Sequence, residues 1–313
     1  MTAPSRVDER LDRYLVRTGI AGSRRSARDL IAQGEVLLNG QRCRKSAIVG
    51  QHDHVEVAAH PTTCAIVPDG EVTVLYEGRN VLVVDKPPLM PCHPIRAGET
   101  GTVINAAVAR YPEVAAAGNN PLEGGLVHRL DNGTSGALMI ARDAATLTMM
   151  RADIRDGRTS RIYEALIVGT LMAPIEIARP IAHSPKNRRK MVALNPDSSG
   201  GRMLASVARA AATVIEPLEQ VGGFTHVTVK PRTGRRHQIR VHMASEGFPL
   251  AGDQLYGGPP LEGLAEGRFW LHLAELEFIT PQNERVRVSA PLASDLRAVL
   301  KRLRLKPDTS ATM

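Results

Sequence analysis

Residues 124–136 read GGLVHRLDNGTSG, which is the most unusual stretch of this chain. A short apolar run enters it and another leaves it, and the glycine, asparagine, threonine and serine between them predict a loop. Such a loop lets the backbone approach a ligand closely, because glycine carries no side chain. Asp131 is its only carboxylate, and Arg129 stands two residues earlier. Composition alone favours a turn aspartate that caps its own backbone, with a functional carboxylate as the alternative.

A second unusual stretch, residues 233–242, reads TGRRHQIRVH and follows a predicted strand. Gly234 is predicted to open a helix, with Arg236 and Arg240 on one of its faces. Arginine, histidine and glutamine recur within eight residues, which is rich in hydrogen-bond donors for a solvated face. A basic surface helix and a binding segment both fit this pattern.

The composition is that of a globular protein with a basic balance. Of the 313 residues, 43% are hydrophobic and 23% are charged, which excludes wholesale disorder and allows two domains. The net charge of +8 is typical of a protein that meets a polyanion, although a solubility role explains it equally well. Aromatic residues make up only 3%, which argues against an RNA reader built on rows of stacking rings.

Several classes of protein lose support because their sequence signatures are missing. No run approaches the roughly 20 apolar residues of a membrane helix, and the charged amino terminus excludes a secretory signal, so we expect the cytoplasm. The three cysteines are scattered and predict reduced thiols. The histidines form no metal template, and the zinc-hydrolase, deaminase, dinucleotide and P-loop motifs are absent from the sequence. We therefore expect neither a metal nor a cofactor.

The amino-terminal segment predicts a small unit of two helices and a hairpin. Apolar residues at helical spacing indicate helices near residues 11–15 and 27–31, and Asn39-Gly40 between two extended runs indicates a hairpin. Basic residues cluster at the second helix, where we expect them to bind phosphate, although each one alone fits a solvated face. They are Arg24, Arg25 and Arg28.

The order of short motifs in this unit resembles an alpha-L (S-four-type) RNA-binding domain. The motifs are Arg10-Leu11-Asp12, residues 23–28, Gly34-Glu35-Val36 and Asn39-Gly40. The resemblance covers about residues 8–57 and implies recognition of structured RNA by shape and phosphate. We expect this domain over residues 1–60, a linker over 61–70, a catalytic domain over 71–304 and a frayed tail over 305–313.

Five ordered motifs in the rest of the chain resemble the RluA family of RNA pseudouridine synthases. The family's H-R-L-D-x-x-T-S-G motif stands at residues 128–136, and the others are residues 85–88, 161–165, 234–240 and 252–257. The resemblance spans about residues 70–300 and implies an α+β fold, with a mixed, largely antiparallel central sheet and a central cleft. The chain departs from the family pattern at Asn132-Gly133, Arg161 and Arg236, which bears on substrate identity more than on the reaction.

The resemblance implies the roles of three catalytic residues. Asp131 is the expected nucleophile and Arg240 its ion-pair partner. Tyr163 offers a flat ring for the uracil and a hydroxyl that could act as a general base. Substrate and product are isomers, so the stoichiometry requires no redox agent, group donor or metal.

The target uridine must leave the helical stack to be reached, which costs on the order of a few kcal/mol. The resemblance implies Arg129 as the residue that fills the gap. Two basic segments supply the other expected RNA contacts, with a solvated loop as an equal alternative for the first. They are Lys186, Arg188, Arg189 and Lys190, and then Arg235, His237 and Gln238.

The expected function is isomerisation of specific uridines to pseudouridine in structured RNA. Ribosomal RNA is favoured over transfer RNA, because a fused alpha-L domain resembles the ribosomal branch of the family. One alternative is a non-catalytic RNA-binding or ribosome-assembly factor, against which the intact Asp131, Tyr163 and Arg240 argue. Another is a DNA-binding regulator, which no helix-turn-helix spacing supports. Neither a membrane nor an obligate protein partner is implied.

Overall fold

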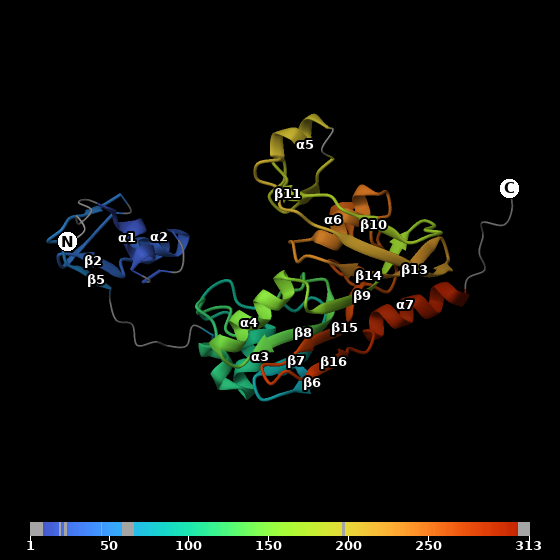
Figure 1. Cartoon of the computed structure of the whole chain (residues 1–313), viewed down its shortest axis with the longest axis horizontal. Coiled ribbons are helices and arrows are strands. Elements are labelled where there is room, and N and C mark those ends of the chain that lie inside the picture. The colour runs from blue at the N-terminus through green and yellow to red at the C-terminus, as the bar shows by residue number, and fades with distance from the viewer. Residues whose placement is uncertain are drawn as a thin grey trace. The chain divides into compact units, whose positions relative to one another are not determined.

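The computed structural model describes residues 9–18, 20–21, 24–44, 46–57, 66–195 and 198–305, without five side chains in helices α2 and α5. The chain divides into two units, Met1–Ala65 and Ile66–Met313, each with a hydrophobic core of its own (Figure 1). Within these ranges, no helix has both the length and the apolar character that crossing a membrane requires.

The first unit combines two helices with short strands. The helices are α1 (Leu11–Arg17) and α2 (Arg24–Gln33). One sheet has the order β3 (Gln41–Arg42), β2 (Val36–Leu38) and β5 (Val55–Val57), and β1 (Glu9–Arg10) pairs with β4 (Ile48–Val49). Asn39 and Gly40 have φ angles of 54° and 76°, as a type I′ turn requires, so the predicted hairpin is confirmed.

A nine-stranded mixed sheet is the framework of the second unit. Its strand order is β10-β13-β14-β9-β15-β8-β7-β6, with β16 paired to β15. β15 and β8 run parallel and the other pairs of this sheet are antiparallel, which confirms the predicted architecture. The strands are β6 (Thr73–Glu77), β7 (Val81–Lys86), β8 (Ser135–Ala141), β9 (Ser160–Val168), β10 (Ile175–Ile177), β13 (Thr213–Val221), β14 (Phe224–Pro231), β15 (Leu271–Ile279) and β16 (Arg285–Ser289).

Helices flank the sheet, and their starts follow the sequence signals. They are α3 (Val103–Arg110), α4 (Ala144–Arg155), α6 (Gln238–Ser245) and α7 (Ser294–Leu305). The Asp143 carboxylate accepts a hydrogen bond from the amide of Thr146 at 2.8 Å, so the predicted N-cap of α4 is confirmed. Thr102 caps α3 in the same way through the amide of Asn105. Each cap satisfies an amide that the first turn of a helix leaves unpaired.

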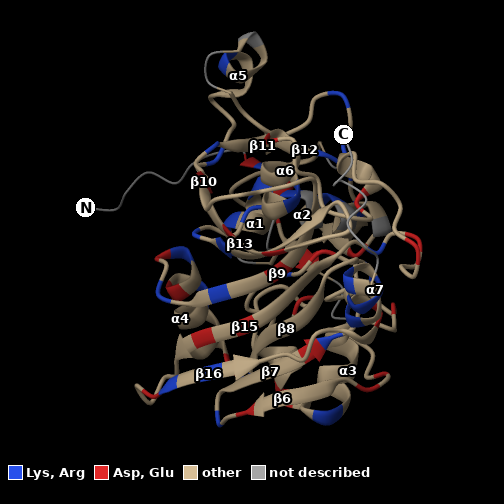
Figure 2. Ribbon diagram, turned by 90° about the vertical axis from the view of Figure 1, so that its right-hand side faces the viewer, with Lys and Arg blue, Asp and Glu red and all other residues tan. Residues whose placement is uncertain are grey.

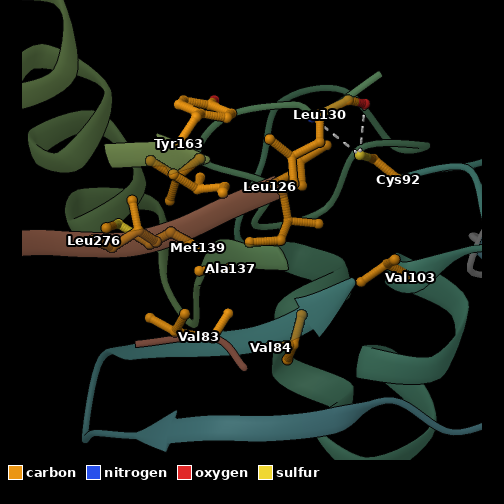
Figure 3. Close-up of a cluster of buried hydrophobic side chains, with 14 of the residues drawn as sticks. Val83, Val84, Cys92, Val103, Leu126, Leu130, Ala137, Met139, Tyr163 and Leu276 are labelled. Carbon is orange, nitrogen blue, oxygen red and sulfur yellow. Dashed lines mark hydrogen bonds between the residues drawn. The ribbon is translucent and has the colours of Figure 1, made fainter. Parts of the chain in front are cut away.

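The main core forms where β7 and β8 are covered on both faces. Every residue of β8 is buried, and so are Val81–Val84 of β7, which explains why these segments read as continuous apolar runs. Figure 3 shows Val83, Ala137 and Met139 within this cluster. A smaller cluster packs α7 against Trp270 and the neighbouring strands.

An extension projects from the second unit between β10 and β13 (Figures 1 and 2). It consists of the antiparallel pair β11 (Ile181–His183) and β12 (Met191–Ala193), followed by the short helix α5 (Ser199–Leu204). We call residues 181–193 the basic hairpin, because Figure 2 marks lysine and arginine in the loop between its strands.

Two expectations from the sequence need correction. The second unit begins at Ile66, which is fully buried in its core, so residues 66–70 of the expected linker belong to that unit; residues 61–65 lie outside the described ranges. Helix α6 begins at Gln238 and not near Gly234, so Arg236 precedes the helix and does not share a helical face with Arg240. The cause is the Gln238 side chain, whose Oε1 accepts hydrogen bonds from the Thr233 hydroxyl and the Arg235 amide and keeps this segment in a turn.

Candidate active site

The two unusual stretches of sequence meet across one cavity of about 570 Å³ in the second unit. One wall comes from the loop that carries Asp131, and the other from residues 231 and 233–240 at the start of α6. Tyr163 of β9 and the buried Cys92 complete the lining near Asp131. The loop arrives just before β8 and α6 follows β14, so the sheet brings together segments that are about 100 residues apart in sequence.

Asp131 and Arg240 form an ion pair inside this cavity. Nη1 of Arg240 donates to Oδ2 of Asp131 at 3.0 Å, and the two side chains are 8% and 23% exposed. The predicted pairing of these two residues is therefore present in the structure. A partly buried, charge-assisted hydrogen bond of this kind orients a carboxylate far better than an exposed pair does.

Asp253 is a third member of this group. Its two carboxylate oxygens accept from Nε and Nη2 of Arg240 at 2.7 and 2.8 Å, and its side chain is 1% exposed. Burial by itself would lower the pKa of Arg240, but the hydrogen bonds and charges of Asp253 and Asp131 outweigh burial and raise it. The guanidinium also stacks on the Phe269 ring, 4.3 Å from the centroid.

His237 lies beside the same carboxylate. Its Nε2 is 3.9 Å from Oδ1 of Asp131, the oxygen that Arg240 does not bind. Burial is the main cause that lowers the pKa of His237 to about 4, despite the opposing charge of Asp131, so the imidazole is neutral near pH 7. His237 has a φ of 54° and is the N-cap residue of α6, and this left-handed backbone directs its ring into the cavity lining.

Tyr163 lines the cavity from β9 and is almost fully buried. Burial raises the pKa of its hydroxyl, and the Asp131 charge acts in the same direction. The residue is therefore a neutral phenol at physiological pH, which suits an aromatic platform better than a phenolate base.

The backbone around Asp131 is fixed by buried side chains that sequence reasoning did not assign to the site. The Lys86 ammonium, fully buried, donates to the carbonyls of Asn132 and Thr134 at 3.2 and 2.7 Å and to that of Pro87 at 2.8 Å. Burial lowers the pKa of Lys86 to about 8, which leaves it mainly protonated at neutral pH. Its place in the Asp85–Pro88 motif was the signal that could have identified it.

Cys92 and Arg268 also hold this loop. The Cys92 thiol donates to the Leu130 carbonyl at 3.3 Å and accepts from the Leu130 amide at 3.4 Å, directly before Asp131 (Figure 3). Arg268 donates to the Gly133 carbonyl, to the Ser135 hydroxyl at 2.8 Å, and to Asp295 in the first turn of α7 at 2.8 Å. No local sequence signal links either residue to Asp131, because the contacts are made only in the tertiary structure.

The glycines of the loop are required by close packing. A Cβ atom at Gly133 would lie 2.3 Å from the Gly267 carbonyl oxygen, and one at Gly136 would lie 2.3 Å from that of Leu273. Gly136 also has a φ of 109°, which side chains disfavour. A side chain at position 133 would therefore clash with residues 267–269, which explains why a glycine stands there in the Asn132-Gly133 departure from the family pattern.

The expected RNA-contacting residues fall into different environments. Arg129 is exposed at the cavity, and its side chain has no polar partner among the described residues. Lys186, Arg188 and Arg189 are exposed in the basic hairpin, and Lys190 at its base is half-buried. These five cations are available to a polyanion.

Two residues of the second basic segment behave differently. Arg235 is exposed, with Nε donating to the Ala210 carbonyl at 3.0 Å. Gln238 is 4% exposed, and its amide nitrogen donates to the Ala212 carbonyl and the Thr213 hydroxyl. Both ends of its amide are bonded within the protein, so Gln238 holds the turn before α6, and its contact with RNA stays a prediction.

In the first unit, Asp12 organises the basic residues. Its fully buried carboxylate accepts from Arg10, Arg24 and Arg28 at 3.1, 3.3 and 3.2 Å. Burial would raise the pKa of Asp12, but these three arginines lower it to about 2. The side chains of Arg24 and Arg28 remain 48% exposed, whereas the Arg25 side chain lies outside the described part of the structure.

Comparison with known proteins agrees with this geometry. Residues 80–245 match the family described as RNA pseudouridylate synthase, and residues 9–55 match the S4 domain. An "Uncharacterized RNA pseudouridine synthase" of Chloroflexus aurantiacus is 35% identical over 303 residues, 96% of this chain and 92% of the relative. "Ribosomal large subunit pseudouridine synthase D" of Pseudomonas aeruginosa is 32% identical over 310 residues, 95% and 92% of the two chains.

A solved structure has a similar fold. Human RNA Pseudouridylate Synthase Domain Containing 1 aligns with a TM-score of 0.55 and 25% identity, over 76% of this chain and 96% of that one. The second unit thus has the fold of enzymes that form pseudouridine in RNA. The chain belongs to the RluA family of RNA pseudouridine synthases and carries an S4 domain before its catalytic unit. Its reaction is the isomerisation of uridine to pseudouridine.

Proposed function

We propose that this synthase modifies specific uridines of large-subunit ribosomal RNA, with Asp131 as its nucleophile. Several relatives with 32–33% identity over most of the chain are named for the ribosomal large subunit. The S4 domain supports a structured RNA substrate. A ribosomal substrate in turn assigns the enzyme to the cytoplasm, where ribosomal RNA matures in bacteria, the source of these relatives.

The reaction makes simple demands on the site. The bond between N1 of uracil and C1′ of ribose breaks, a bond between C5 and C1′ forms, C5 loses a proton and N1 gains one, so atoms and electrons balance within the substrate. A carboxylate is needed at the junction of sugar and base, and Asp131 is the carboxylate that the cavity offers there. No external oxidant, reductant or group donor enters the balance.

The single observation that carries this assignment is the Asp131–Arg240 ion pair at 3.0 Å in the cavity. Arg240 fixes one oxygen of Asp131, and Asp253 fixes Arg240, so the nucleophile is held in one orientation before substrate arrives. Preorganisation of this kind lowers the barrier because the enzyme does not have to reorient its charges during the reaction.

The remaining residues of the cavity bind the flipped nucleotide. Tyr163 supplies the ring on which the uracil stacks, as a neutral phenol. Arg129 fills the space that the uridine leaves in the RNA, and its exposed guanidinium, which has no polar partner among the described residues, is available for that task. The basic hairpin and Arg24 and Arg28 of the S4 domain contact phosphates, which carry most of the sequence-independent affinity.

The test is to map pseudouridines in ribosomal and transfer RNA from cells that lack the protein and from cells that express it again. We expect specific large-subunit sites to lose pseudouridine and to regain it with the wild-type chain but not with Asp131→Asn. The Asp131→Asn protein should still bind the RNA, because its carboxylate makes a small part of the contact surface.

Other outcomes separate the parts of the proposal. If only transfer RNA sites change, the substrate assignment is wrong while the enzyme class stands. If Asp131→Asn restores every site, Asp131 is not the nucleophile. If growth or ribosome assembly depends on the protein while no pseudouridine changes, the chain acts as a non-catalytic assembly factor.

A further inference from the structure

The basic hairpin carries positive charge that no described residue neutralises. Lys186, Arg188 and Arg189 are exposed in its loop, and none of them forms an ion pair with a described residue. The strands pair in register, with His183 opposite Met191, and the Ser184 amide donates to the Lys190 carbonyl at 3.0 Å. The loop is therefore a structured cationic tip on a short antiparallel stem.

The base of this hairpin is packed against α6, the helix that carries Arg240. Ile181 and Met191 are buried against Val241 of α6, with Tyr256 packed on the same cluster. The backbone amide of Met191 donates to the Tyr256 hydroxyl at 2.8 Å. That amide belongs to the peptide bond after Lys190, so one peptide bond separates the basic loop from Tyr256.

Tyr256 in turn contacts both residues that flank Asp131. Its hydroxyl oxygen lies 2.9 Å from Nδ1 of His237, and its ring centroid lies 5.0 Å from the guanidinium carbon of Arg240. His237 and Arg240 approach different oxygens of the Asp131 carboxylate. Tyr256 thus connects the basic hairpin to His237 and Arg240, the two residues that lie beside Asp131.

The hydrogen bonds around Tyr256 and the Asp131 charge opposite Nε2 together favour one tautomer of His237. The Met191 amide can only donate, so it occupies a lone pair of the tyrosine oxygen and leaves the hydroxyl proton for Nδ1 of His237. A neutral imidazole that accepts at Nδ1 carries its own proton on Nε2. That N–H then faces Oδ1 of Asp131, whereas the other tautomer would present a lone pair to a negative charge.

We propose that Tyr256 is a positioning residue that couples RNA contact at the basic hairpin to the orientation and tautomer of His237 beside Asp131. The inference rests on the proposed function, since it assumes that phosphates bind the hairpin and that Asp131 acts on the base. RNA that immobilises the tip also immobilises Met191, which fixes the tyrosine hydroxyl and, through it, the imidazole. RNA that does not reach the hairpin leaves this group less well ordered at the moment of reaction.

The first experiment removes the hydroxyl and keeps the ring. Tyr256→Phe in the full-length protein retains the stacking on Arg240 and the packing against Met191. We expect the single-turnover rate at saturating RNA to fall roughly tenfold, with the dissociation constant of the RNA changed less than about twofold. Tyr111→Phe is the matched control, because it also removes a hydrogen-bonded hydroxyl, here the donor to Glu77 at 2.6 Å, from a tyrosine that lies outside the cavity lining.

The second measurement is the tautomer and the pKa of His237, which a loss of packing alone would not change. Nitrogen NMR of histidine-labelled protein without RNA should show the proton on Nε2 in the wild type and a shift toward Nδ1 in Tyr256→Phe. The pKa of His237 should rise in the variant, because the tyrosine proton no longer stabilises the neutral ring. The charges that face this imidazole are Asp131 and Asp253, which favour protonation, and Arg240 and Arg236, which oppose it.

The third readout is the coupling itself, measured by a double-mutant cycle. In the wild-type background, Arg188→Gln with Arg189→Gln should weaken RNA binding and also slow turnover at saturating RNA. In the Tyr256→Phe background, the same pair should weaken binding but leave the saturating rate unchanged. A saturating rate that falls by the same factor in both backgrounds would overturn the coupling, and so would a wild-type His237 tautomer in Tyr256→Phe. If the wild-type enzyme itself makes no pseudouridine, the proposed function fails, while the NMR measurement still decides the Tyr256–His237 relation.

Discussion

Asp253 binds Arg240 through two parallel hydrogen bonds, from Nε at 2.7 Å and from Nη2 at 2.8 Å. This leaves Nη1 as the nitrogen that reaches Asp131, at 3.0 Å. Two nitrogens of the planar guanidinium bind the buried Asp253 carboxylate, and this fixes the position of Arg240. The third nitrogen, Nη1, points into the cavity toward Asp131. The orientation of the proposed nucleophile therefore depends on a second aspartate that does not have to touch the substrate.

Asp253→Asn should impair the chemical step more than RNA binding. The amide accepts one hydrogen bond instead of two, so Arg240 loses its fork geometry and Asp131 its fixed partner. We expect the single-turnover rate to fall at least about tenfold, with RNA affinity within about twofold of wild type. Loss of a buried charge partner should also lower the free energy of unfolding by roughly 3 kcal/mol, which urea denaturation can measure. An unchanged rate would show that Asp253 does not position Arg240.

Arg240→Lys tests the fork directly. Lysine keeps the positive charge but has a single nitrogen, which cannot bind Asp253 in two places and reach Asp131 as well. We expect at least a tenfold loss of turnover, about 1.4 kcal/mol of barrier. Arg236→Lys is the control, because Arg236 is exposed in the turn before α6; it should react at the normal rate. Equal effects of the two substitutions at saturating RNA would contradict the Asp131–Arg240 pair.

Cys92→Ala should loosen the backbone directly before Asp131. The substitution removes the thiol that bonds both the amide and the carbonyl of Leu130 and leaves these groups unsatisfied at a buried site. We expect a loss of roughly 1–3 kcal/mol in the free energy of unfolding and a slower single-turnover rate. Cys92→Ser keeps a donor and an acceptor and should recover much of the rate. If the alanine and serine variants have the same single-turnover rate and the same free energy of unfolding, the hydrogen bonds of the thiol contribute to neither.

Stability should fall as the pH is lowered from about 6.5 to 4. Burial lowers the pKa of His128 to about 3 and that of His237 to about 4, against an ordinary value of 6.5. Below pH 6.5 the unfolded chain therefore takes up protons that the folded chain does not, and proton uptake favours the unfolded state. His128→Gln removes one such proton, so urea denaturation should show a flatter pH slope in this variant. An identical slope would mean that His128 titrates normally in the folded protein.

Deletion of residues 1–65 should remove phosphate contacts without removing the catalytic core, because the two units have separate cores. Each lost contact lowers the slope of log K against log salt by roughly 0.7–0.9. We expect weaker RNA binding and a flatter salt dependence, measured by titration at several salt concentrations. The same slope with and without the segment would show that the S4 domain does not contact this RNA.

The sequence by itself determined the class of this protein and most of its elements. Residues 128–136 and 234–240 indicated the catalytic family. Asn39-Gly40 predicted a turn and Asp143 a helix start, because turn and cap residues determine the backbone conformation of the few residues around them. The pairing of Asp131 with Arg240 was also expected, although from the family resemblance and not from local pattern.

Only the tertiary structure decided how that pair is held. The start of α6 was misplaced because Gln238 bonds the preceding turn through its side chain, a preference that helix propensity does not include. Cys92, Arg268 and Asp253 lie 39, 137 and 122 residues from Asp131 and meet its loop or its partner through hydrogen bonds that the order of strands in the sheet brings about. Local sequence pattern reports the conformation of a segment, whereas contacts between distant segments depend on packing, and packing determines the orientation of the charge on which the chemistry depends.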